Sequence, residues 1–113
     1  MTAARLGAGE RQAALAALPA WRHDAQRDAI ARSFRFADFR AAFGFMTHVA
    51  LAAERLNHHP EWCNVFDRVD IVLTTHDAGG LSALDLALAR IADAAYAAHA
   101  AHAAQTTPAA TSD

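Results

Sequence analysis

The sequence contains a single cysteine, Cys63, among 113 residues. One cysteine excludes an internal disulfide framework and any zinc module built from several cysteines, so nothing indicates an oxidising compartment. The chain also lacks an excess of charge of either sign, because its formal net charge is only -2. Without a basic field to neutralise phosphates, direct binding to nucleic acid is not expected.

Long hydrophobic runs are absent as well. No stretch of strong hydrophobes approaches the roughly 20 residues that cross a bilayer, and residues 1–10 lack the apolar segment of a secretion signal. These absences predict a cytoplasmic protein with no membrane partner. Alanine supplies more than a quarter of the chain and buries little area per residue. The larger side chains must therefore form one modest core, in a single domain over residues 1–113.

The first part of the chain predicts a helix followed by two strands. Residues 10–18 are good helix formers that a proline ends, residues 21–23 can begin a strand, and the polar residues 24–28 suit a hairpin loop. Residues 29–36 alternate between apolar and polar side chains, which is the period of a half-buried strand. Arg32 interrupts the apolar face, so we expect it near a sheet edge with its head in water, or against a partner subunit.

The longest predicted helix spans residues 39–56, with Asp38 as its N-cap. Phe45 and Leu51 lie off the main apolar stripe of this helix, so we expect a second helix or a second subunit to cover them. The stripe, which we interpret as core, consists of apolar residues at helical spacing: Phe39, Ala42, Phe43, Met46, Val49, Ala50 and Ala53.

The last part of the chain predicts a hairpin and a final helix. Residues 62–66 and 69–74 have the composition of two strands, and residues 75–80 form a loop that ends in paired glycines. Ser82 and Asp85 fit a capping box at the start of the final helix. The alanine-rich end of that helix can fray.

The predicted order is therefore α-β-β-α-β-β-α. Paired strands separated by helices favour an α+β domain with a four-stranded antiparallel sheet and helices packed on one face. We expect the folded part to cover about residues 10–104, between flexible tails, with disorder beyond Gln105.

Three of the seven histidines lie at the ends of predicted elements, where a rigid scaffold presents side chains into a cleft. Two of them, His58 and His59, precede Pro60, which disfavours helical backbone angles in the residue before it and so places them at a helix-to-strand corner. The third, His76, lies in the loop before the final helix. Glu54 precedes His58 by four residues and can reach that imidazole if the helix persists.

Several chemistries suit these imidazoles. They titrate near neutral pH, so together they can remove one proton and deliver another. They can also hold a zinc ion with one open position, and spacing alone does not separate these interpretations. A third interpretation is that the His-His-Pro corner only caps the long helix. Nearby, Trp62 offers a flat apolar wall for a planar heterocycle, and Asp85 either closes its capping box or orients a site residue.

The remaining candidates have simpler explanations. We expect His99 and His102 to face solvent on the final helix, one turn apart, because two ligands in an alanine-rich tail make a poor metal site. No polar neighbours in sequence give His23 or His48 a functional role. Cys63 is expected to be a small core residue.

The combined motif is specific to one family. Its residues are Asn57, His58, His59, Pro60, Glu61 and Trp62, then Asn64, Val65 and Phe66, then Thr75, His76 and Asp77, then Gly80, Leu81, Ser82 and Asp85, with Arg27, Asp28, Ala29, Ile30, Phe34, Phe36, Asp38, Phe39, Ala42, Phe43, Gly44, Phe45, Met46, Val49 and Ala50 upstream. Over about residues 15–94 the chain thereby resembles the pterin-4a-carbinolamine dehydratases. It departs from them at Asn57, where animal members carry aspartate, and at Phe66, where tyrosine is usual.

The resemblance implies a dehydratase that eliminates water from 4a-hydroxytetrahydropterin, the product left by aromatic amino acid hydroxylases, and forms quinonoid dihydropterin without a cofactor or a metal. It implies three catalytic histidines, of which we expect His59 and His76 to supply the acid and the base, with His58 in support. The supporting or substrate-binding residues it implies are Glu54, Asn57, Trp62, Thr75 and Asp85.

Two alternatives stay open. Animal members of the family also bind a transcription factor as a dimerisation cofactor, and some bacterial members are linked to expression of the hydroxylase, so the chain can instead be a protein-binding regulatory cofactor. It can also act on another pterin, such as one in molybdopterin metabolism. The expected partners are a pterin substrate, a functionally linked aromatic amino acid hydroxylase and further copies of the chain in a homodimer or homotetramer.

Overall fold

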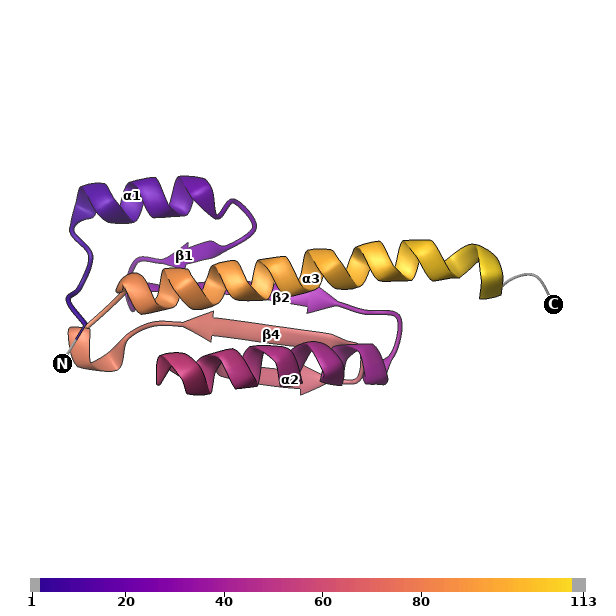
Figure 1. Ribbon diagram of the computed structural model, residues 1–113. Helices are drawn as coiled ribbons and strands as arrows, with labels where there is room; N and C mark the ends of the chain where they lie inside the picture. The colour runs from indigo at the N-terminus through magenta and orange to yellow at the C-terminus, as the bar shows by residue number, and fades with distance from the viewer. Residues whose placement is uncertain (1–2, 111–113) are drawn as a thin grey trace.

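The computed structural model describes residues 3–110, and their side chains as far as residue 100. The predicted order of elements is confirmed, with one extra turn of 3₁₀ helix before the last helix (Figure 1). The elements are α1 (Ala8–Ala17), β1 (Arg22–Asp24), β2 (Ala29–Arg35), α2 (Phe39–Leu56), β3 (Glu61–Val65), β4 (Arg68–Leu73), η1 (His76–Ala78) and α3 (Ala83–Ala110).

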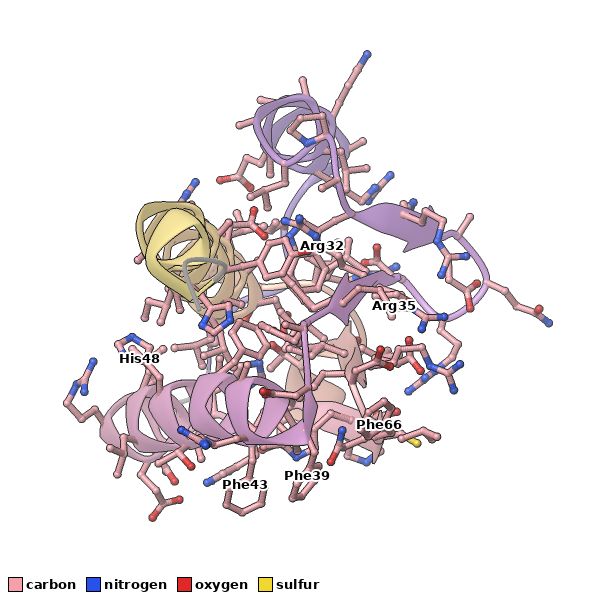
Figure 2. The ribbon with its side chains drawn as sticks, turned by 90° about the vertical axis from the view of Figure 1, so that its right-hand side faces the viewer. Arg32, Arg35, Phe39, Phe43, His48 and Phe66 are labelled. Atoms are coloured by element: carbon pink, nitrogen blue, oxygen red, sulfur yellow. The ribbon has the colours of Figure 1, made fainter. Side chains whose placement is uncertain are left out.

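The strands form one sheet in the order β1-β2-β4-β3, and each neighbouring pair is antiparallel. Side chains alternate across this sheet, so Val69, Ile71 and Leu73 of β4 point into the core while the residues between them are half-buried. The core also takes residues from α1, α2 and α3, so the three helices pack on one face (Figure 2). The predicted α+β fold is therefore confirmed.

The buried face of α2 differs from the predicted stripe. Phe45, predicted to be covered by a second helix or a second subunit, is buried: its ring centroid lies 4.7 Å from that of Phe34, 5.0 Å from that of Phe36 and 6.3 Å from that of Tyr96 in the second helix, α3. Phe39 and Phe43, predicted to be core, are 48% and 55% exposed and contact each other instead. Apolar residues surround this helix, so the aromatic cluster on the sheet, and not the helical period, selects the side that is buried.

At Arg32 the strand pairs with β4 alone, since the pairing with β1 ends at Ala31, but the head of Arg32 does not lie in water as predicted. Its guanidinium donates to Asp93 of α3 at 2.6 Å and lies over the rings of Phe34 and Tyr96, 4.5 Å and 5.1 Å from their centroids. The carboxylate and the two aromatic faces compensate a partly buried cation. Arg32 therefore joins the sheet to α3 within one chain.

Secondary structure and backbone contacts are also present outside residues 10–104, the predicted folded part. Near the N-terminus, Leu6 donates its backbone N–H to Leu81 at 2.8 Å, and Arg5 forms a β-bridge with Ser82, so residues 5–7 belong to the fold. At the other end α3 passes Gln105 and continues to Ala110, as its high alanine content favours. The outermost parts of the predicted tails, residues 1–2 and 111–113, lie outside the described residues.

Cys63 is exposed, so its predicted place in the core is wrong. It alternates with Trp62 along β3 and pairs in register with Asp70, on the sheet face opposite the helices. In the described part of the chain, no helix is long and apolar enough to cross a membrane.

Candidate active site

The helix α2 ends in a left-handed turn at Asn57, whose φ and ψ are 50° and 44°. Asparagine tolerates this conformation better than most residues. The backbone N–H of His58 returns to the carbonyl of Ala53 at 3.0 Å, which satisfies a carbonyl at the helix end. Because the chain reverses here, the two adjacent imidazoles separate: the side chain of His58 is 9% exposed, whereas that of His59 is 57% exposed.

The buried imidazole of His58 contacts Asp85 across the fold, with 2.5 Å between Nε2 and Oδ1. The other carboxylate oxygen, Oδ2, accepts hydrogen bonds from Thr75 Oγ1 at 2.7 Å and from the backbone N–H of Ser82 at 2.9 Å. Both interpretations of Asp85 therefore agree with the geometry. One oxygen closes the capping box of α3, and the other holds the ring of His58.

Glu54 pairs with His59 and not with His58, the partner that helical spacing predicted. The prediction assumed that the helix persists through His58, but α2 ends at Leu56 and the turn at Asn57 moves both histidines off the helical path. Both members of the Glu54–His59 pair are exposed, so this contact is weaker than the buried one.

His76 begins the turn η1 in a tight loop between β4 and α3. Two backbone hydrogen bonds close the loop, from Thr75 N to the Gly80 carbonyl at 3.0 Å and from Gly80 N to the Thr75 carbonyl at 3.3 Å. Gly79 has a φ of 76°, which glycine adopts without strain. The loop and the end of α2 together border a hollow of about 280 Å³, lined by Asn57, His58, His59, Glu61, Thr74, Thr75, His76 and Asp77.

The three predicted catalytic histidines therefore border one hollow, together with Asn57 and Thr75. Trp62 is absent from this lining: it is half-buried on the helix side of β3, paired in register with Ile71 and packed against the core. Its predicted role as a wall of the pocket stays a prediction.

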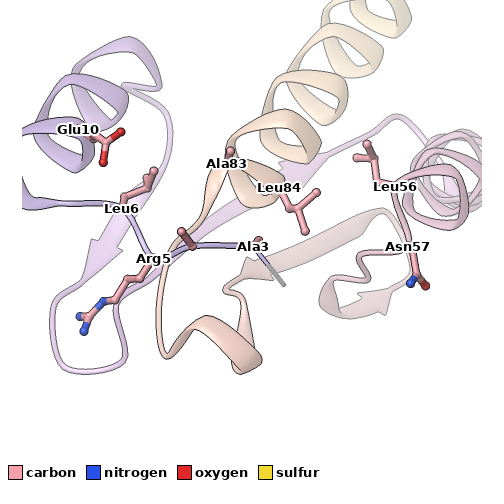
Figure 3. A pocket seen from close by; sticks show the side chains of 9 residues that line it. Ala3, Arg5, Leu6, Glu10, Leu56, Asn57, Ala83 and Leu84 are labelled. Atoms are coloured by element: carbon pink, nitrogen blue, oxygen red, sulfur yellow. The ribbon is translucent and has the colours of Figure 1, made fainter. Parts of the chain in front are cut away.

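A second hollow of about 600 Å³ adjoins the first at Asn57, which lines both. Residues 3–6 run across the start of α3 and form one side, and the end of α2 forms another (Figure 3). Most of its lining is small or apolar: Ala3, Ala4, Arg5, Leu6, Glu10, Leu56, Asn57, Ala83 and Leu84.

Sequence reasoning missed one buried polar residue near the site, Asp28, which it placed in a hairpin loop. Asp28 is 2% exposed and accepts hydrogen bonds from His23 Nε2 at 2.7 Å, Arg5 Nε at 3.0 Å and Leu81 N at 3.1 Å. Burial alone would raise the pKa of this carboxyl, but the bonds from His23 and Arg5, followed by that from Leu81, outweigh it and lower the pKa below its ordinary value. The Arg27–Asp28 pair in the family motif was the available signal.

His23, His48 and His99 do not line the hollow. His23 has the polar partner that its sequence neighbours did not indicate, Asp28, while His48 is exposed on α2 (Figure 2). His99 is half-buried against Phe36, 5.2 Å between ring centroids, so the prediction that it faces solvent is wrong. The side chain of His102 lies outside the described residues.

This arrangement can hold a planar molecule between proton donors and acceptors. A neutral His58 that donates from Nε2 to Asp85 keeps Nδ1 as an acceptor, so the buried carboxylate selects one tautomer. His59 and His76 add two exposed imidazoles to the same border. Within the described residues, no group of three or more His, Cys, Asp and Glu side chains has an arrangement that could hold a metal ion.

Comparisons with known proteins agree with the sequence motif. A family model described as pterin 4 alpha carbinolamine dehydratase matches residues 4–95. A relative from Rhizorhabdus wittichii is 65% identical over 85 residues, which cover 75% of this chain and 88% of the relative. Another from Burkholderia orbicola is 57% identical over 91 residues, covering 80% and 89%. Both carry the provisional name pterin-4-alpha-carbinolamine dehydratase.

A solved structure has the same fold. It is the crystal structure of a transcriptional coactivator/pterin dehydratase from Brucella melitensis, with a TM-score of 0.78 and 49% sequence identity. The match covers 81% of this chain and 98% of that chain, so the similarity extends over essentially the whole of the solved protein.

Proposed function

The chain belongs to the pterin-4a-carbinolamine dehydratase family, and on that premise we propose that it removes water from 4a-hydroxytetrahydropterin to give quinonoid dihydropterin. In the cytoplasm, this reaction would return the pterin released by an aromatic amino acid hydroxylase to its reduction cycle. The observation that carries the proposal is the hollow bordered by three imidazoles, one of which a buried carboxylate orients.

The reaction needs an acid and a base near one carbon. The C4a–O bond breaks and the hydroxyl leaves as water after it receives a proton from the acid. The base takes the proton from ring nitrogen N5, and the electron pair of that N–H bond forms the C4a=N5 double bond. Protons balance, because one is delivered and one is removed, and no electron is gained or lost.

We assign the acid and base roles to His59 and His76, the exposed imidazoles of the hollow. The Glu54 carboxylate contacts Nε2 of His59 and can therefore hold that ring in one orientation. The contact between the buried side chains of His58 and Asp85 holds the His58 imidazole in one tautomer, and in this way it supports the site. General acid and base residues each contribute about 10²- to 10⁴-fold in rate.

The test is turnover of carbinolamine generated in place by an aromatic amino acid hydroxylase, followed by ultraviolet absorbance. We expect His59→Ala and His76→Ala each to lower kcat by about 100-fold or more. His48→Ala is the matched control, because it removes an exposed imidazole outside the hollow and should retain full turnover. Equal rates in all three variants would refute the assignment. Turnover that a chelator abolishes would instead favour the zinc interpretation.

The second hollow bears on which pterin is used. The substituent of a pterin is on C6, which is bonded to N5 and thus lies two bonds from the reacting carbon. A ring placed in the histidine hollow can therefore extend its substituent past Asn57 into the second hollow. Its mostly apolar lining suits an uncharged substituent better than a polyanionic one, which favours a biopterin-like substrate over a phosphorylated pterin.

A protein-binding role is the second candidate, because the Brucella melitensis protein is described as a transcriptional coactivator as well as a dehydratase. The surface feature that favours it is a group of large apolar side chains exposed on α2 and on the hairpin of β3 and β4: Phe39, Phe43, Leu51, Val65 and Phe66. Figure 2 shows Phe39 and Phe43 pointing outward from α2. Such a surface commonly binds another copy of the same chain, so we propose a homo-oligomer first and a regulatory partner second.

A further inference from the structure

Asp28 occupies the turn between β1 and β2 in an unusual state. Its φ is 51°, in the left-handed region that aspartate visits only occasionally, and it is 2% exposed. A buried carboxylate in such a conformation persists only where its surroundings specify it. Asp28 does not line either of the two hollows, so it has no direct part in the chemistry proposed above.

The contacts of Asp28 hold both ends of the loop that carries His76. Before the loop, Thr74 donates its hydroxyl to the backbone carbonyl of Asp28 at 3.1 Å. After the loop, the backbone N–H of Leu81 donates to the carboxylate at 3.1 Å. The backbone bonds between Thr75 and Gly80 close the loop between these two points. Asp28, which is distant in sequence, is therefore hydrogen-bonded to the residue before this loop and to the residue after it.

The other partners of Asp28 anchor it to the rest of the fold. His23 contacts Oδ1 at 2.7 Å and Arg5 donates to Oδ2 at 3.0 Å, so β1 and the N-terminal segment both hold the carboxylate. Gly80 packs directly on it, because a Cβ at that position would lie 2.3 Å from Oδ2. This close approach leaves little freedom for the loop to shift relative to Asp28.

We propose that Asp28 is a positioning residue that keeps His76 at the border of the histidine hollow by holding both ends of its loop. This inference rests on the proposed function only for its effect on turnover, since the coupling of Asp28 to His76 is a property of the fold. Loss of the carboxylate should displace the imidazole, and a displacement of about 1 Å can cost on the order of 100-fold in rate.

The experiment compares Asp28→Asn with Asp24→Asn. Asp24 is the last residue of β1, directly before the same turn, and its carboxylate accepts from the backbone of Gln26 and Arg27 within that turn. Two quantities are measured: kcat and KM for carbinolamine dehydration, and the imidazole NMR signals of His76, assigned by their loss in His76→Ala. For Asp28→Asn we expect kcat to fall at least about 10-fold with KM changed less than about 2-fold, and the His76 signals to shift.

Asp24→Asn should change neither quantity. A merely structural role for Asp28 predicts lower thermal stability with unchanged kcat and unchanged His76 signals, and that result would overturn the proposal. If Asp28→Asn does not fold, Thr74→Val tests the proposal instead, because it removes the hydrogen bond from Thr74 to the Asp28 carbonyl while keeping the side-chain shape. Unchanged His76 signals in Thr74→Val would also overturn the proposal. If the wild-type protein shows no dehydration, the proposed function fails, but the NMR comparison still tests the coupling.

Discussion

Replacing Asp85 by asparagine tests whether this buried carboxylate orients His58 or only caps α3. The substitution keeps the side-chain shape but replaces one oxygen by an NH₂ group, which cannot accept. Asp85 is fully buried and accepts from His58, Thr75 and Ser82 at 2.5 Å, 2.7 Å and 2.9 Å. Asparagine can therefore satisfy the donors at one oxygen position only.

The expected loss of stability follows from these contacts. Hydrogen bonds to a charged group contribute about 1.5–3 kcal/mol and neutral ones about 1 kcal/mol, while a buried donor left without an acceptor costs about 1–3 kcal/mol. Relief from burying a charge offsets part of this loss. The free energy of unfolding of Asp85→Asn should therefore fall by about 2–4 kcal/mol, which urea denaturation measures.

Turnover separates the two roles of Asp85. If the NH₂ group faces His58, the proton of that imidazole must move to Nδ1 and the tautomer is inverted; if it faces Ser82, the first turn of α3 is disturbed and the ring loses its fixed support. Either way we expect kcat to fall about 10- to 100-fold, measured where the variant is fully folded.

Asp93→Asn is the matched control. Asp93 lies on the same helix and accepts from Trp21 at 2.9 Å and from Arg32 at 2.6 Å, far along α3 from the hollow. It should lose stability and keep wild-type kcat. If Asp85→Asn behaves in the same way, Asp85 is only a helix cap and the proposed support of His58 is wrong.

Three further predictions concern stability, assembly and substrate. Because the folded-state pKa of Asp28 is lowered, the stability that its carboxylate contributes is present above the ordinary pKa of about 3.9 and is lost as pH falls through the folded-state value. The free energy of unfolding of Asp28→Asn in urea should therefore vary less with pH in that acid range than that of the wild type. An equal variation with pH in both proteins would contradict this. If the proposed homo-oligomer forms through this surface, Phe43→Ser should reduce its mass in analytical ultracentrifugation. An unchanged mass argues that the surface binds another partner. Ala83→Leu narrows the second hollow and should raise KM for a carbinolamine with a dihydroxypropyl substituent, but not for its 6-methyl analogue. Ala94→Leu, on an exposed part of α3, should change neither KM. Equal effects of Ala83→Leu on both substrates would show that the substituent does not occupy that hollow.

Local sequence patterns sufficed for much of the fold. Asp38 begins α2 at the predicted residue, with its carboxylate accepting from Ala41 at 2.8 Å, and the alternation of β4 places Val69, Ile71 and Leu73 in the core. Caps and periodicities depend on residues within about one helical turn or two strand positions, so the chain alone reveals them. The same local logic failed for Glu54, because it assumed a helix that a left-handed Asn57 had already ended.

The sequence by itself determined the element order, the fold class and the histidines that stand at element ends. The tertiary structure alone decided which side of α2 is buried, that His58 turns inward to Asp85, and that Asp28 ties the turn between β1 and β2 to the loop of His76. The pairings of His58 with Asp85 and of Asp28 with Leu81 join residues 27 and 53 positions apart. They arise only when the sheet and helices close on one another, because no local pattern in the chain specifies which distant donor will meet a buried carboxylate.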